Sequence, residues 1–420
     1  MRSKALALTA AFILLLTVPA EILATDGYFT LGYGTRSQGM GGTGVAFPLG
    51  TLSPATNPAG LALGEGGWEL GVGLFNPNRG YEVKGNPSGY PGTFGLAPGK
   101  FESGSKLFPI PHVGYAKKVG SNGIFGLAMY GNGGMNTNYS NKAFGFSPVG
   151  VNLSQMFIAP TYAATFGGKH AIGATALIGY QMFEAKGLQA FSGYSSNPAK
   201  LTNTGTDSAF GFGVRVGYLG QLSKQFAVGA SYQSRIAMGE FKKYAGLYAE
   251  QGDFDIPSNW TVGVAITPND KVRIAFDVQQ MNYGDVKSVA NPMLPNLMQS
   301  PLGTDNGAGF GWKNMTAVKF GVEHHASPGF TWRAGYAYGK QPIPSSEVLF
   351  NILAPGVIEQ HATFGFSQAV GTGKNIDFAL TRAFNKNVSG PNPLEVPGLQ
   401  TITLGMDQWV FTVGYSVKFK

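Results

Sequence analysis

The chain has 420 residues, of which 63 are glycine, roughly twice the share of about 7% in ordinary proteins. Charged residues make up only 12%, aromatic residues reach 13%, and cysteine is absent. The glycines show no period of three, which excludes a collagen, and 43% of the residues are hydrophobic, which excludes a disordered chain. The absence of cysteine excludes a disulfide scaffold and a cysteine-ligated zinc site.

The first 24 residues predict a secretory signal peptide. Arg2 and Lys4 form a basic start, and an apolar run from Ala5 to Ala20 follows it. Cleavage is expected after Ala20 or after Ala24. An uncleaved anchoring helix is the alternative, but the run is short for the ~20 residues of a membrane span.

Residues 25–66 come next and form a separate unit, because they are rich in glycine and show no alternation of apolar and polar residues. Ahead of a barrel, such a segment could fill the lumen as a plug. A disordered periplasmic tail is the alternative, and composition alone leaves both open.

Residues 67–420 alternate with a period of two, which is typical of β-strands with two different faces. The first strand shows the pattern with Trp68, Leu70, Val72 and Leu74 on one face and Glu69, Gly71 and Gly73 on the other. A soluble sandwich would carry many charged residues on its second face. Here that face holds mainly glycine, serine, threonine and alanine, which indicates a transmembrane barrel with its apolar face toward lipid.

Turn signals set the number of strands. Six short turns are expected near residues 120–122, 167–170, 222–225, 267–270, 326–329 and 371–374. Seven longer stretches rich in Gly, Pro, Asn and Ser are expected as loops at about residues 80–108, 133–152, 185–207, 240–257, 286–312, 341–357 and 386–405. Thirteen connections predict an all-β fold, a 14-stranded antiparallel transmembrane β-barrel whose termini both lie on the periplasmic side.

Several blocks of sequence resemble the FadL-type outer-membrane transporters of hydrophobic compounds. The resemblance begins at the predicted mature N-terminus and extends over essentially the whole mature chain. It rests on DGYFTLGYGTRSQGMGGTGVA (26–46), NPAGL (57–61), YGNGGMN (130–136), KGLQAF (186–191), EQGDFDIP (250–257) and LFNILAPGV (349–357).

This resemblance implies a barrel in the bacterial outer membrane whose N-terminal hatch, residues 25–66, lies in the lumen. It also implies passive uptake of long-chain fatty acids or other hydrophobic compounds. The ligand is caught by external loops and passed to a lumen site, then released when the hatch moves, and it leaves sideways through the barrel wall. A lateral exit suits a lipid-soluble molecule, because it avoids a water-filled channel.

Two groups of residues take roles in release through this resemblance. Asn57, Pro58 and Ala59 correspond to the hatch element, although an ordinary Asn-Pro turn would look the same. The third predicted strand ends in a glycine-rich stretch that could bend to form the lateral opening, with the start of a flexible loop as the alternative. The residues of this stretch are Gly131, Asn132, Gly133 and Gly134.

Candidate ligand contacts come from loops and from the lumen face. Apolar residues on the third and fourth long loops suggest a capture surface, and packing of the loops on themselves is the alternative. These residues are Leu188, Phe191, Leu247, Tyr248, Phe254 and Ile256. The alternation also places arginines on the lumen face, where one or two could bind a carboxylate group and the others would pair with acidic residues. They are Arg215, Arg235, Arg273 and Arg333.

No enzyme, cofactor or metal is expected. The Gly39–Gly44 stretch fits a dinucleotide-binding pattern, but no strand precedes it. The five histidines form no convincing metal set. The expected partners are a hydrophobic small molecule, outer-membrane lipid and lipopolysaccharide, with no nucleic acid and no second copy of the chain. A barrel enzyme such as a lipase or protease, or a general porin, is the alternative. The sequence leaves the cargo open, and also the effect of Lys420, which follows the terminal aromatic Phe419, on assembly.

Overall fold

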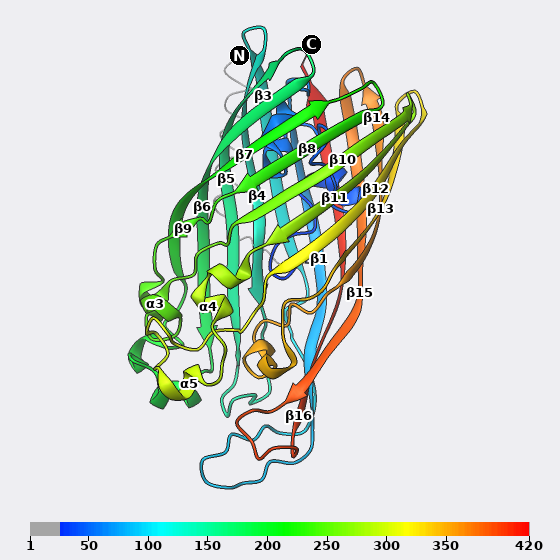
Figure 1. Cartoon of the computed structure of the whole chain (residues 1–420). Coiled ribbons are helices and arrows are strands. Elements are labelled where there is room, and N and C mark those ends of the chain that lie inside the picture. Colours follow the sequence, from blue (N-terminus) through cyan, green and yellow to red (C-terminus); the bar gives the residue numbers. More distant parts are fainter. Residues whose placement is uncertain (1–25, 420) are drawn as a thin grey trace.

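The computed structural model describes residues 26–419, so the predicted signal peptide and Lys420 lie outside the described residues. Fourteen antiparallel strands form one closed barrel, because the last strand, β16, pairs with the first strand, β1, along its whole length (Figure 1). The predicted fold class and strand number are confirmed. The barrel strands are β1 (Gly67–Lys84), β3 (Phe108–Val119), β4 (Gly123–Asn136), β5 (Gly150–Phe166), β6 (His170–Lys186), β7 (Asp207–Gln221), β8 (Phe226–Gln233), β10 (Asn259–Asn269), β11 (Val272–Met281), β12 (Met315–Ser327), β13 (Phe330–Gly339), β14 (Gln360–Gly371), β15 (Lys374–Pro391) and β16 (Thr401–Lys418).

The two ends of the barrel differ in their connections. At one end, called the turn end, six short turns join the strands at the positions that the sequence predicted. Gly67 pairs with Lys418 there, so the barrel begins and ends at the turn end. At the opposite end, called the loop end, seven long connections carry two short strands and most of the helical turns. These are β2 (Gly99–Glu102), β9 (Ala237–Met238), α3 (Ala249–Gly252), α4 (Lys287–Ala290), α5 (Asn296–Gln299), η3 (Gln189–Tyr194), η4 (Pro198–Lys200), η5 (Lys242–Tyr244), η6 (Tyr283–Asp285), η7 (Ser345–Glu347) and η8 (Phe350–Ile352).

The two faces of the wall follow the predicted alternation. Outward apolar side chains are exposed, as in β1, where Leu70, Val72 and Leu74 keep 40 to 46% of their surface exposed. Such a belt matches lipid contact, and the closed ladder gives the backbone polar groups their partners within the wall. Among residues 26–419, no helix is long and apolar enough to cross a membrane.

Three adjacent strands run further than predicted. β1, β15 and β16 each span 18 residues and project beyond the other strands at the loop end (Figure 1). The predicted loops at 80–108 and 386–405 are therefore too long. The alternation of apolar and polar residues does not reveal these extensions, because their outward side chains are polar, as at Asn78 and Thr403. Polar outward residues suit strands that project beyond the hydrocarbon layer.

The N-terminal segment, residues 26–66, lies inside the barrel. It contains α2 (Gly34–Gly39), η1 (Ser53–Ala55) and η2 (Pro58–Leu61), and it contacts strands on opposite sides of the wall. Glycines on the inner face make room for it. A Cβ atom at Gly321 would lie 2.5 Å from the carbonyl oxygen of Met40, and one at Gly217 would collide with the Asn57 side chain. These inward glycines therefore let the segment pack directly on the backbone of the wall.

Candidate functional site

Asn57, Pro58 and Ala59 form a buried joint between the N-terminal segment and the wall. The Asn57 side chain accepts a hydrogen bond from the Ala59 N–H (3.0 Å), which caps η2, and Pro58 occupies the first position of that turn. The side-chain amide nitrogen of Asn57 donates to the carbonyl oxygens of Val45 (2.6 Å) and of Tyr218 on β7 (2.9 Å). One side chain thus joins two parts of the segment to the barrel.

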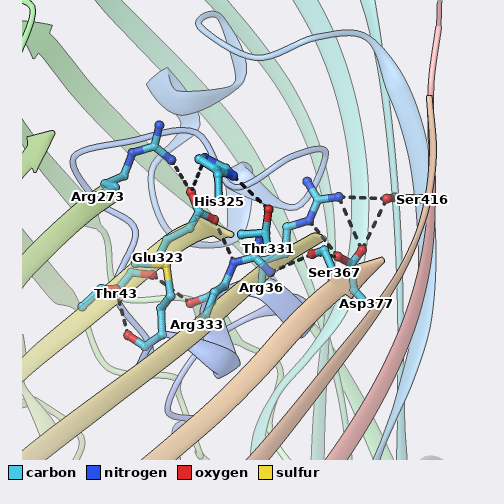
Figure 2. Close-up of polar contacts among 12 residues, drawn as sticks. Arg36, Thr43, Arg273, Glu323, His325, Thr331, Arg333, Ser367, Asp377 and Ser416 are labelled. Atoms are coloured by element: carbon cyan, nitrogen blue, oxygen red, sulfur yellow. Dashed lines mark hydrogen bonds and ion pairs between the residues drawn. The ribbon is translucent and has the colours of Figure 1, made fainter. Parts of the chain in front are cut away.

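A network of charges fixes α2 at the turn end of the lumen (Figure 2). Arg36 on α2 pairs with Asp377 on β15, with 3.2 Å between Nε and Oδ1, and also donates to the Ser416 hydroxyl (2.9 Å). Asp277 on β11 accepts the N–H groups of Gly44 (2.8 Å) and Val45 (3.0 Å). Charged groups from two sides of the wall therefore hold residues 34–45 in place.

Two of the predicted lumen arginines belong to the same network. Glu323 on β12 accepts hydrogen bonds of 2.8 Å from both Arg273 and Arg333, and Arg333 also donates to Ser367 (2.7 Å) (Figure 2). Arg273 lies over the ring of Phe47, with 5.0 Å between its guanidinium carbon and the ring centre. In this structure both arginines contact a carboxylate and not an open binding space.

The other two predicted arginines differ from each other. Arg215 is buried and donates to the carbonyl oxygens of Pro54 (2.9 Å) and Ala55 and to the Tyr130 hydroxyl (3.2 Å), so it ties η1 to the wall. The prediction that Arg235 faces the lumen is wrong. β8 ends at Gln233, so the alternation no longer applies at Arg235. Its side chain is 42% exposed and pairs with Asp253 and Asp255 of the same connection, which joins β8 to β10.

The predicted bend in the third barrel strand coincides with a break in the wall. In the described chain, pairing of β3 with β4 ends where His112 meets Tyr130, and the register of β4 with β5 shifts between Gly131 and Gly133. Asn132 is the extra residue of this β-bulge. Its buried side chain donates to Gln155 (3.1 Å) and accepts from the Tyr33 hydroxyl (2.9 Å).

The first described residues occupy the edge of β4 that β3 leaves open. We call residues 26–33 the N-terminal arm. The Thr30 N–H donates to the Asn132 carbonyl oxygen (3.1 Å), and the Gly134 N–H donates to the Tyr28 carbonyl oxygen (3.1 Å). Phe29 forms an antiparallel bridge with Gly133. The arm thus satisfies backbone groups that an open strand edge would leave unpaired.

The arm is held on its other side by aromatic rings and one ion pair. Tyr28 lies within 6.0 Å, between ring centres, of Phe254, Tyr283 and Trp312. The Tyr283 hydroxyl donates to the Asp26 carbonyl oxygen and accepts from the Tyr28 N–H (3.1 Å). Asp26 also pairs with Lys319 of β12 at 3.1 Å, and both side chains are at most 3% exposed. The sequence alone gave no sign of this contact, since its partners lie far apart along the chain.

Four of the six predicted capture residues come together at the loop end, and most of the six are buried. Leu188, Phe191, Leu247 and Tyr248 line one apolar cavity of about 40 Å³. The fifth and sixth long loops complete its wall with residues that the sequence reasoning missed, namely Leu302, Phe310, Phe350 and Leu353. Phe254 and Ile256 lie elsewhere, Phe254 against Tyr28 and Tyr248, and Ile256 in a bridge with Ile236.

A second small cavity, of about 30 Å³, adjoins the arm and the bent part of β4. Gly27, Gly134, Met135 and Trp312 contribute to its lining. A volume of this size holds about two water molecules. Neither this cavity nor the loop-end cavity, at about 40 Å³, has room for more than a few water molecules.

The sequence of residues 32–419 matches the outer membrane protein transport protein family (OMPP1/FadL/TodX). The chain belongs to this family. Members of the FadL/TodX family are outer-membrane transporters of hydrophobic compounds and not enzymes, so the predicted family, location and lack of enzymatic function are confirmed. Among residues 26–419, no group of three or more His, Asp or Glu side chains could hold a metal ion.

Solved structures with the same fold include FadL/TodX channels. The Pseudomonas putida toluene transporter TodX is 18% identical with a TM-score of 0.68, and the match covers 93% of this chain and 99% of that one. A Pseudomonas aeruginosa FadL homologue is 15% identical with a TM-score of 0.72, covering 94% and 100%. The Ralstonia pickettii toluene transporter TbuX is 19% identical with a TM-score of 0.62, covering 93% and 99%. No curated protein sequence matches the chain.

Proposed function

We propose that this FadL-family protein takes up long-chain fatty acids or aromatic hydrocarbons by passive diffusion and releases them sideways through its wall. The loop end faces the cell exterior and the turn end faces the periplasm. The observation that carries the proposal is the open edge of β4 beyond Tyr130, which the N-terminal arm occupies. A peptide edge in a barrel wall needs a covering segment, and a segment that covers the edge through non-covalent contacts alone can leave it.

The loops supply the entrance in this proposal. The cavity formed by Leu188, Phe191, Leu247 and Tyr248 is apolar, so it attracts a hydrophobic molecule from water. Buried apolar contacts continue from there to the rings around Tyr28. A hydrophobic molecule that follows this route would contact the same apolar side chains that now pack against the aromatic residues of the arm, and so it would compete with the arm for these contacts.

The N-terminal segment acts as a hatch of two parts. Residues 34–62 are fixed by Arg36, Asp277, Arg215 and Asn57, and they fill the lumen between the two membrane sides. The arm has a separate set of anchors, chiefly Lys319, Tyr283 and the edge of β4. We infer that cargo displaces the arm while the fixed part stays, which opens the wall between β3 and β4 without opening a water channel.

Removing the bulge tests this route. Deletion of Asn132 is expected to restore regular pairing along β4, and the control Asn132→Ala keeps the bulge and loses only the side-chain hydrogen bonds. Both variants should be checked for folding by the heat-dependent shift of the barrel on gels. Uptake of labelled toluene and oleate should fall to background in the deletion and persist in the control. Normal uptake by a folded deletion variant would refute lateral exit at this place.

Sugar flux separates the proposal from a general porin. Liposomes that contain the wild-type protein should not swell rapidly in sugar solutions, because residues 34–62 fill the lumen. Fast swelling would instead favour a water-filled pore.

A further inference from the structure

A polar groove of about 390 Å³ lies on the outer side of the extension formed by β1, β2, β15 and β16. Its volume is within the range of small-molecule sites, unlike that of the two closed cavities along the proposed cargo route. The groove is outside the barrel because its lining residues on β1, such as Asn78 and Glu82, continue the face that carries the exposed Leu70 and Leu74 nearer the turn end. It takes no part in the proposed uptake.

The floor of the groove is open backbone at Gly405, whereas a Cβ atom at the neighbouring Gly80 would collide with the Phe101 carbonyl oxygen of β2. Gly80 of β1 pairs directly with Gly405 of β16, and Gly405 pairs with Asn387 of β15 on its other side. The missing side chain at Gly405 leaves a depression where a ligand can approach the main chain closely. The close approach of β2 accounts for glycine at position 80, so the open part of the floor lies at Gly405.

The rim of the groove carries hydrogen-bonding groups in fixed positions. Asp407 accepts hydrogen bonds from Asn78 (3.2 Å) and from Arg382 (2.7 Å), which orient its carboxylate. Glu82 and Glu102 add two further carboxylates, which pair with Lys84 (3.9 Å) and Lys106 (3.0 Å), and Lys100 of β2 adds a cation to the lining. The rim therefore combines paired charges with amides, so it suits a neutral ligand whose many hydroxyl groups can both donate and accept hydrogen bonds.

The height of the groove points to the source of such a ligand. On β16 the outward residues change from Phe411 and Trp409, which are exposed in the apolar belt, to Asp407 and Thr403 in the groove. Arg382 lies over the Trp409 ring at 4.8 Å, at the boundary of the belt, where aromatic girdles of outer-membrane barrels sit. The groove therefore adjoins the headgroup layer at the loop end of the barrel.

We propose that this groove binds a sugar residue of the lipopolysaccharide core, in the outer leaflet that surrounds the barrel. The carboxylates accept hydrogen bonds from the sugar hydroxyls, and the side-chain amides donate hydrogen bonds to them. The open backbone at Gly405 leaves room for the sugar ring. The same lipid also offers phosphate groups, and binding of lipid A alone, which carries phosphates but no core sugar, distinguishes the two sources. The bound sugar would hold the projecting strands in the glycolipid layer beside the entrance.

The test compares two leucine substitutions on β16. Gly405→Leu fills the floor, and its Cβ meets only the Asn387 side-chain oxygen at 2.7 Å, which can move. Thr401→Leu is the control, because Thr401 is exposed outside the groove. The purified, detergent-solubilised proteins are titrated with core-bearing lipopolysaccharide, with the free core oligosaccharide and with lipid A alone, and binding is followed by native mass spectrometry.

The wild type and Thr401→Leu should bind the core-bearing lipid more tightly than lipid A, and the free oligosaccharide should compete. Gly405→Leu should weaken oligosaccharide binding by at least about tenfold while uptake of hydrophobic cargo is unchanged. If that variant does not fold, Asn387→Ala should weaken binding several-fold. Equal binding of lipid A and the core-bearing lipid, no binding of the oligosaccharide to the wild type, or unchanged binding in a folded groove variant would overturn the proposal.

Discussion

Replacement of Lys319 by methionine is expected to release the N-terminal arm from the wall. Lys319 pairs with Asp26 at 3.1 Å and also donates to the Leu31 carbonyl oxygen (2.7 Å), so it contacts the arm at two points. Methionine has a similar length but no charge. The Lys319→Met variant therefore leaves the Asp26 carboxylate, which is 1% exposed, without its cation.

The magnitude follows from burial. Removal of one partner from a buried ion pair costs about 3–5 kcal/mol, because the remaining charge stays out of water. The barrel ladder does not depend on this pair, so the cost falls on the equilibrium between the docked and the released arm. An energy of about 3–5 kcal/mol shifts that equilibrium by roughly 100- to 4,000-fold.

Hydrogen exchange followed by mass spectrometry measures this shift directly. Amides of residues 26–33 should exchange faster by a comparable factor in Lys319→Met, whereas amides of β12 and β13 should keep their protection. The double variant Asp26→Asn with Lys319→Met removes both charges and should regain most of the protection. If exchange in the arm of a folded Lys319→Met protein stays within about threefold of the wild type, the ion pair does not hold the arm and this reasoning is refuted.

Three further predictions concern the fixed part of the hatch, the entrance and a titrating loop. Asn57→Ala should destabilise residues 45–62 by about 1–3 kcal/mol, because it leaves buried backbone groups unpaired, and hydrogen exchange of that segment checks this. Leu247→Asp should raise the KM of uptake with little change in the maximal rate, which saturation kinetics in cells would show. Burial, together with the neighbouring Asp255, raises the pKa of Asp253 to about 7, so the folded loop keeps a proton that the unfolded chain loses near pH 4. Stability of the loop at 240–257 should therefore fall as the pH rises from about 4 to about 7, and Asp253→Asn should flatten this dependence in limited proteolysis.

The barrel could be predicted from the sequence because strand alternation is a local signal. Each wall strand reveals its lipid face through residues such as Leu70 and Val72, and each short turn marks where the next strand begins. The prediction was wrong where the surroundings change. The extensions of β15 and β16 carry polar residues outward because they project beyond the apolar belt, and Arg235 lies past the end of its strand.

The partners of the lumen charges could not be predicted in the same way. The alternation predicts that Asp377 faces inward, but it does not predict that Asp377 pairs with Arg36, which lies 341 residues earlier in the chain. The composition indicated only indirectly that the lumen is filled, through the many small residues on the inner face of the wall. The contact of Gly321 with Met40 explains why the inner face carries small residues, because the N-terminal segment lies directly against the wall there.

Photo-crosslinking of a hydrophobic cargo analogue tests the central claim of lateral release most directly. The protein in native outer membranes is illuminated with a diazirine-bearing fatty acid or alkylbenzene, and labelled peptides are identified by mass spectrometry. The account predicts label along the apolar loop cavity, on the arm, and on both sides of the gap between β3 and β4, near Phe108 and Gly134. Label that instead continues along residues 34–62 to the turn end, with none on β3 or β4, would contradict it.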